Sequence, residues 1–218
     1  MRHCMRAFVS ILSLTLIACN LNEKRTAIVI PNTKDTTILL SDSLGNISIS
    51  VPNNFDTFFK WPPPPDDSRY FWMHKYRFQP KTFPIFKEVG YYYPQLKDSI
   101  FSFTIQHYKR SAYYFKSDTS YLFNYYYPSE KKDLLANPMT ADANISDTIE
   151  FINGNYFAIF SVDLFDSLRK QYSKKLIATS AKNNSIIELH YELLTKLNDS
   201  INNYFLKDSR RLLSRIRF

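Results

Sequence analysis

The sequence predicts an α+β protein in which an antiparallel sheet, built from hairpins, packs against a C-terminal amphipathic helix. Short runs that alternate apolar and polar residues occur near both ends of the chain, and Asn153-Gly154 separates two of them. An Asn-Gly pair between two alternating runs is the strongest short-range signal for a β-hairpin. An apolar stripe at helical spacing then closes the chain after residue 198.

The first hairpin is expected between residues 36 and 52. Residues 36–40 form a β-rich run, residues 41–46 carry turn residues, and residues 47–51 alternate isoleucine or valine with serine. This alternation is typical of a half-buried strand, and Pro52 ends it because proline has no N–H to donate.

The middle of the chain, residues 61–128, is rich in proline and aromatic residues. Pro62–Pro65 follow Trp61 directly, and four consecutive prolines favour a stiff polyproline II loop. Aromatic runs at 70–73, 99–105 and 121–127 predict strands. Consecutive tyrosines on a strand point to both faces. They either pack as amphipathic strand residues or line a surface that binds glycans, small ligands or peptides.

The sequence after residue 128 predicts its helices and strands more clearly. Residues 129–138 predict one or two helical turns that Pro138 ends, and residues 147–152 and 156–162 flank the Asn-Gly turn. Two further strands are expected at 175–179 and 185–193, and the second places four apolar side chains on one face: Ile187, Leu189, Tyr191 and Leu193.

The chain is expected to end in a helix. Asn198 or Asp199 can cap its first turn, because a short polar side chain accepts a hydrogen bond from a free backbone N–H. Its apolar residues fall largely on one stripe: Ile201, Tyr204, Phe205, Leu212, Leu213 and Ile216.

Glu188, His190 and Glu192 lie on the opposite face of the last predicted strand from Leu189 and Tyr191. Alternate residues on a strand lie about 6.5–7 Å apart. Two of the three side chains, with one from a neighbouring strand, could hold a divalent ion. The other interpretation is the polar outer face of an amphipathic strand, and the sequence favours it.

No pattern in the chain predicts catalysis. Its three glycines, Gly45, Gly90 and Gly154, cannot form a phosphate-binding loop or a dinucleotide fingerprint, and no Gly-x-Ser-x-Gly turn is present. We therefore expect no catalytic residue, no cofactor and no metal ligand.

The N-terminus has the pattern of an export signal. Arg2 and Arg6 precede an apolar run of twelve residues, 7–18. This run is too short to cross a membrane, because a spanning helix needs about 20 residues.

Leu16-Ile17-Ala18-Cys19 resembles the lipobox of bacterial lipoproteins. This resemblance implies that the Cys19 thiol carries a diacylglyceryl group, that its amine carries a further acyl chain such as palmitate, and that Cys19 is the first mature residue. We thus expect a signal peptide at 1–18, a lipid-anchored tether at 19–35 and one globular domain at 36–218. Asn20 after the cysteine, in place of aspartate, favours the outer membrane, and we expect the protein to face the periplasm.

Charge and export together limit the partners. Loss of Arg2 and Arg6 with the signal lowers the formal net charge from +8 to +6. Basic surfaces attract nucleic acids, anionic membranes or acidic proteins. Export excludes nucleic acid as a normal partner, so the membrane, reached through acylated Cys19, and another envelope protein are expected.

Val51-Pro52-x-x-Phe55, the paired strands around Asn183-Asn184, and Leu212-Leu213-Ser214-x-Ile216 resemble parts of PsbP-like domains. This resemblance implies an α/β/α sandwich and an accessory role without catalysis. The resulting hypothesis is an envelope protein that binds another protein or complex. The alternatives are a lipoprotein that binds glycans or small ligands through residues 61–128, and, less favoured, an envelope hydrolase or metal-dependent enzyme.

Overall fold

The computed structural model describes residues 32–41, 43–61, 73–82, 99–110 and 117–218, and these form an antiparallel sheet with helices on both faces. The seven sheet strands lie in the order β3 (Thr57–Trp61), β4 (His74–Gln79), β5 (Ile100–Lys109), β9 (Ser185–Thr195), β8 (Gln171–Lys182), β7 (Asn155–Asp166) and β6 (Asn144–Ile152). A separate antiparallel hairpin consists of β1 (Thr33–Leu40) and β2 (Gly45–Pro52). The helical segments are α1 (Asp118–Tyr121), the π-helix η1 (Leu122–Tyr126), α2 (Tyr127–Ala136), the 3₁₀ turn η2 (Pro138–Thr140) and α3 (Ser200–Leu213).

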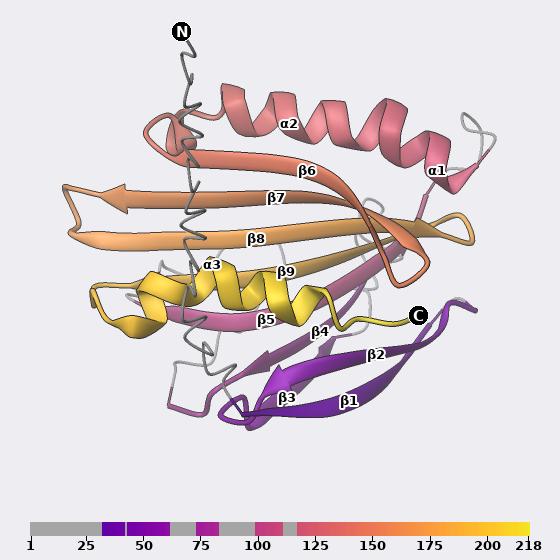
Figure 1. Ribbon diagram of the computed structural model, residues 1–218, viewed down its shortest axis with the longest axis horizontal. Coiled ribbons are helices and arrows are strands. Elements are labelled where there is room, and N and C mark those ends of the chain that lie inside the picture. Colours follow the sequence, from indigo (N-terminus) through magenta and orange to yellow (C-terminus); the bar gives the residue numbers. More distant parts are fainter. Residues whose placement is uncertain (1–31, 42, 62–72, 83–98, 111–116) are drawn as a thin grey trace, which may run out of the picture.

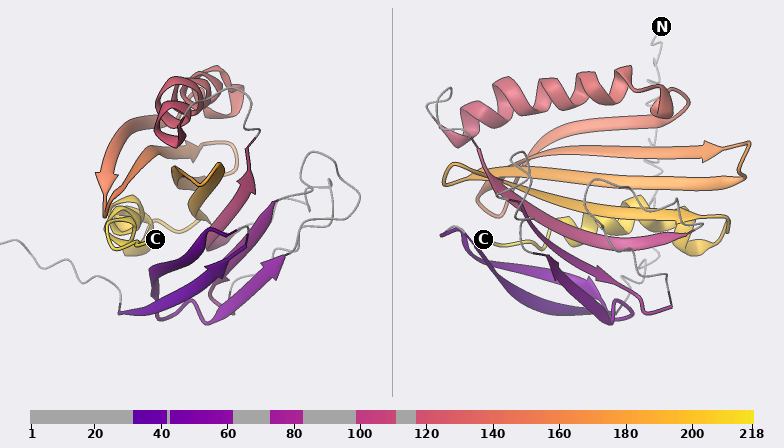
Figure 2. Two further views of the ribbon diagram at one scale, coloured as in Figure 1. Left: turned by 90° about the vertical axis from the view of Figure 1, so that its right-hand side faces the viewer. Right: turned by 180° about the vertical axis from the view of Figure 1, so that it is seen from behind.

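The layers follow the expected α+β arrangement. In Figure 1, α3 and the β1–β2 hairpin lie in front of the sheet. Helices α1 and α2 run along the β6 edge of the sheet, at the top of the view. The end-on view of Figure 2 shows that the sheet curls around α3, whereas the α1–α2 segment lies on the outer side of the curve. The predicted antiparallel sheet with a C-terminal helix packed on it is confirmed.

The main core lies between the sheet, the β1–β2 hairpin and α3. Leu189 and Tyr191 of β9 point into it, together with the buried residues Phe205, Leu212 and Leu213 of α3. The sequence therefore predicts correctly which side chains of β9 face the core, and this face of β9 is buried along most of its length.

The Asn153-Gly154 turn joins β6 to β7 as predicted. Asn153 and Gly154 have φ angles of 48° and 88°. Both are positive, as a type I′ turn requires. The Asn153 side chain also donates to the carbonyl oxygens of Ser214 and Ile216, at 2.9 and 2.7 Å. This turn thus fastens the end of the chain after α3 to the sheet.

Helix α3 begins at the predicted cap, since Asp199 Oδ1 accepts from the backbone N–H of Asn202 at 2.9 Å. Part of the predicted stripe is wrong. Ile201 and Tyr204 are exposed, because α3 stands over a hollow there and not directly on the sheet.

The strand predicted at 121–127 is also wrong, since these residues belong to α1, η1 and the start of α2. The Ser117 side chain accepts from the backbone N–H of Ser120 at 3.1 Å and so caps the helix. Leu122 and Tyr126, four residues apart, then pack on Ala158 and Phe160 of β7. Helix capping and burial against the sheet thus override the β propensity of an aromatic run.

Several predictions fall outside the described residues. These are the signal peptide, the lipobox with Cys19, most of the tether at 19–35, Pro62–Pro65 and the run at 70–72. Strand β1 begins at Thr33, so the last residues assigned to the tether belong to the fold. Within the part of the chain that the structure describes, no helix is long and apolar enough to cross a membrane.

We predict that Leu189→Asp abolishes cooperative unfolding. Leu189 is 0% exposed. The substitution would lose about 2–5 kcal/mol of apolar packing and would also bury an unpaired charge. Leu168→Asp is the control, because Leu168 is 95% exposed, and it should change stability by less than about 0.5 kcal/mol. Circular dichroism melts test both, and an unchanged melting temperature for Leu189→Asp would contradict this core assignment.

Candidate functional site

The polar face of β9 lies under the α1–η1–α2 segment. Glu188, His190 and Glu192 do share this face, opposite Leu189 and Tyr191, as the alternation predicts. Glu188 is not on an outer surface, however, because it is only 8% exposed. A buried carboxylate needs hydrogen-bond donors around it, so the surroundings of Glu188 define the candidate site.

Strand β5 provides two of these donors. Gln106 lies directly opposite Glu188 in the antiparallel register, and its side-chain amide donates to Glu188 Oε2. The Tyr108 hydroxyl donates to Glu188 Oε1 at 3.1 Å. His190 Nε2 lies 3.1 Å from Glu188 Oε2 and donates to it. Both carboxylate oxygens are therefore occupied by neighbours within the fold.

A further contact joins this cluster to η1. The Tyr126 hydroxyl accepts from Thr179 Oγ1 of β8 at 2.8 Å and lies 3.5 Å from Glu188 Oε1. The second contact is long for a hydrogen bond, so Thr179 is the stronger partner. Through Tyr126, the π-helix is held over the polar face of β8 and β9.

The protonation states follow from these contacts. Burial by itself would raise the pKa of Glu188, but the hydrogen bonds from His190, Gln106 and Tyr108 outweigh it and lower the pKa below its ordinary value. Burial, together with the charge of Glu188, raises the pKa of Tyr108 far above its ordinary value. Glu188 is thus an anion that accepts, and Tyr108 is a phenol that donates.

A second acid nearby has the opposite shift. Burial raises the pKa of Glu130 on α2, and the negative charge of Glu188 raises it further. Glu188 is therefore stabilised in its charged form, whereas the charged form of Glu130 is destabilised.

Glu192 does not join this cluster. It forms an ion pair with Lys175 of β8 at 3.2 Å. Its burial would raise its pKa, but the charge of Lys175 lowers it below the ordinary value. Among the described residues, no group of three His, Cys, Asp or Glu side chains has the geometry to hold a metal ion. The structure thus does not bring Glu188, His190 and Glu192 together as metal ligands.

The network offers little for catalysis. A general base must lie within hydrogen-bond reach of its substrate, whereas Glu188 is buried and each of its oxygens accepts a hydrogen bond from within the fold. In the described part of the chain, His190 has no hydrogen bond to a serine, threonine or cysteine that it could activate. This arrangement is suited to fixing η1, β5 and β9 relative to one another.

Sequence reasoning missed Gln106, Tyr108 and Tyr126 as neighbours of Glu188, and Thr179 as the partner of Tyr126. One signal was available, because Ser102, Thr104, Gln106 and Tyr108 alternate with the apolar residues of β5 and so mark a polar face. The register that places Gln106 opposite Glu188 depends on tertiary packing.

A group of three exposed aromatic rings lies on the same side of the sheet, beyond the buried network. We call Phe123 of η1, Phe151 of β6 and Tyr156 of β7 the aromatic patch. The ring centroids of Phe123 and Tyr156 are 5.2 Å apart, and those of Phe151 and Tyr156 are 4.9 Å apart. All three are exposed. These three rings are the candidate contact surface on this side of the sheet.

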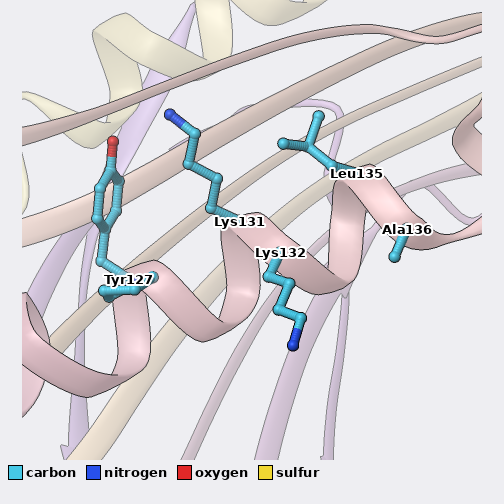
Figure 3. A pocket seen from close by; sticks show the side chains of 6 residues that line it. Tyr127, Lys131, Lys132, Leu135 and Ala136 are labelled. Carbon is cyan, nitrogen blue, oxygen red and sulfur yellow. The ribbon is translucent and has the colours of Figure 1, made fainter.

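A shallow hollow on α2 is a weaker candidate. Figure 3 shows Tyr127, Lys131 and Leu135 along one side of the helix, and Lys132 and Ala136 on the other. Every residue that lines this hollow comes from α2. It has no opposing wall from which polar groups could converge on a ligand, as binding pockets have.

Comparisons with known proteins do not assign a family. No protein-family model matches the chain, and no curated protein matches it. Among solved structures, a protein from Bacteroides thetaiotaomicron aligns with 78% of this chain at 12% identity and a TM-score of 0.34. The chain spans only 44% of that protein's length.

Two smaller proteins align over most of their length. LpqN of Mycobacterium tuberculosis, described as involved in cell envelope biogenesis, aligns with 85% of this chain and 90% of its own at 11% identity and a TM-score of 0.41. The cyanobacterial PsbP protein of Synechocystis aligns with 88% of this chain and 95% of its own at 7% identity and a TM-score of 0.39. A PsbP protein is among these structures, but such low scores do not establish the PsbP-like assignment, which stays a prediction.

We predict that Glu188→Gln lowers the unfolding free energy at neutral pH by about 1.5–3 kcal/mol, because hydrogen bonds to a charged acceptor are lost. The folded-state pKa of Glu188 is below its unfolded value near 4.5. Its stabilisation is therefore present above pH 4.5 and is lost as pH falls through the folded pKa. Denaturant titrations at several pH values should show the wild-type advantage shrinking below about pH 4.5. A difference that does not change with pH would show that the charge of Glu188 is not the cause.

Proposed function

We propose that this protein is a lipid-anchored accessory protein of the cell envelope that binds another envelope protein and catalyses no reaction. The export pattern and the lipobox-like sequence at Leu16–Cys19 support the location. The burial of Glu188, each of whose oxygens accepts a hydrogen bond from within the fold, supports the absence of catalysis.

The aromatic patch is the observation that carries the binding role. Its three rings come from η1, β6 and β7, so the fold brings together side chains that are distant in sequence. Aromatic residues are enriched at protein interfaces, where they bury a large area with few rotatable bonds. The patch also lies at β6, the last strand at one edge of the sheet.

The π-helical geometry supports the same role. In η1, the backbone N–H of Tyr127 bonds to the carbonyl of Leu122, five residues back, and the wider turn buries Leu122 while Phe123 is exposed. Short π-helical segments occur frequently at functional sites. Segment η1, which the sequence predicts to be a strand, thus exposes the aromatic side chain of Phe123.

We predict that the mature chain starts at Cys19 and carries acyl chains. Metabolic labelling with a palmitate analogue should label the wild type, and Cys19→Ser should lose the label and leave the membrane fraction, because one peptide tether without lipid gives no anchoring. Mass spectrometry of the native protein checks the N-terminus. A soluble, unacylated wild-type protein would contradict the anchor.

We predict that a photocrosslinker at position 151 forms a discrete adduct with one envelope protein in intact cells. Phe151 is 63% exposed within the aromatic patch, whereas Phe165, which is 49% exposed near the other end of β7, is the matched control. The adduct should disappear on Phe123→Ser with an unchanged melting temperature. Equal adducts at positions 151 and 165, or none at either, would argue against the patch as the binding surface.

A further inference from the structure

A pocket of about 490 Å³ lies between α3, the turn after β2, and strands β5 and β9. It is on the opposite side of the sheet from the aromatic patch, where α3 crosses in front of β5 and β9 in Figure 1. Its volume falls within the range of about 300–1,000 Å³ that is typical of small-molecule sites.

Five of the thirteen residues that line this pocket are aromatic. Phe55 and Phe101 meet edge to face with centroids 4.7 Å apart, and Phe101 meets Phe205 of α3 at 6.2 Å. Such walls favour an apolar ligand, and a flat ring can pack against them by the same offset or edge-to-face contacts.

Two exposed residues of α3 line the pocket. Ile201 and Tyr204, which the helical stripe predicted to be buried, both line it. Their exposure is therefore confined to the place where α3 stands over a hollow.

Three residues that line the pocket carry a buried side-chain oxygen with no hydrogen-bond partner among the described residues: Ser102 Oγ, Tyr191 Oη and Asp208 Oδ1. Tyr191 is 3% exposed, so its hydroxyl cannot turn to bulk water. Asp208 Oδ1 has an ion-pair contact with Arg211 Nη1, but at 3.6 Å this is longer than a hydrogen bond. Buried polar groups in native proteins are nearly always paired, so an unpaired hydroxyl that lines a pocket indicates a missing partner.

The chemistry of the lining limits that partner. Burial raises the pKa of Tyr191, so its hydroxyl keeps its proton and acts as a donor. Asp208 is the charged residue of the lining, and it disfavours an anionic ligand. The apolar walls disfavour any ion that lacks a partner of opposite charge.

We propose that this pocket binds an uncharged, flat-ringed small molecule with a hydrogen-bond acceptor at its inner end, to which the Tyr191 hydroxyl donates. Asp208, nearer the rim, accepts from a donor group on the same ligand. This site is separate from the aromatic patch, so the protein has a protein-binding face and a ligand-binding face on opposite sides of one sheet.

The test is a fluorescence titration of the purified full-length chain with prodan, an uncharged naphthalene ketone whose emission depends on polarity and on hydrogen bonding to its carbonyl. Wild-type protein should bind prodan at one saturable site. Tyr191→Phe, which removes only the hydroxyl, should weaken binding about five- to tenfold and shift the bound emission to the blue, as loss of one hydrogen bond requires. The melting temperature of Tyr191→Phe should not fall, since the hydroxyl has no partner to lose.

Tyr204→Ala and Tyr156→Ala are the matched pair of controls. Tyr204 is 48% exposed at the rim, and Tyr156 is 42% exposed in the aromatic patch. Tyr204→Ala should weaken prodan binding about tenfold, whereas Tyr156→Ala should leave it unchanged within about twofold, because only the first removes pocket wall. Absence of saturable binding, or equal effects of the two alanine variants, would overturn the proposal, as would Tyr191→Phe binding prodan like the wild type.

Discussion

The buried carboxylate of Glu188 on the central strand is the constraint around which one whole face of this protein is arranged. An ionised carboxylate away from water is stable only if hydrogen bonds replace its hydration. Here β5 supplies Gln106 and Tyr108, and β9 itself supplies His190. This requirement fixes the register of β5 against β9, because a shift of one residue would turn Gln106 and Tyr108 to the other face.

The same constraint places the helical layer. Tyr126 reaches the network through Thr179, and Leu122, one turn earlier, packs on β7. With these two residues directed at the sheet, Phe123 faces outward and meets Tyr156. A buried polar network thus positions an exposed aromatic surface, and the opposite face of the sheet is left to the apolar core and the pocket under α3.

The sequence predicts those parts of the fold that are set by local chemistry. The Asn153-Gly154 turn, the alternation in β9 and the Asp199 cap each depend on a few neighbouring residues, and each appears in the structure. The run at 121–127 could not be read this way, because its capping by Ser117 and its burial on β7 outweigh the β propensity of tyrosine and phenylalanine.

The sequence predicts less of the candidate sites, because residues from distant segments form them. Glu188 was identified from its position on a strand, but its partners come from β5, β8 and η1, which only the folded register brings together. The pocket under α3 depends on how far Ile201 and Tyr204 stand from the sheet, and the helical period alone places both on the buried stripe. Contacts between distant segments carry this information.

Native-state hydrogen exchange in Tyr126→Phe, compared with the wild type, tests this account most directly. The variant removes the hydroxyl that joins η1 to Thr179 and the Glu188 network but keeps the ring that packs on β7. We predict faster exchange of the amides in α1, η1 and the first turn of α2, with the protection of α3 and the β6–β7 hairpin unchanged. Unchanged protection in η1, or an equal loss throughout the sheet, would contradict the claim that the buried network holds this segment in place.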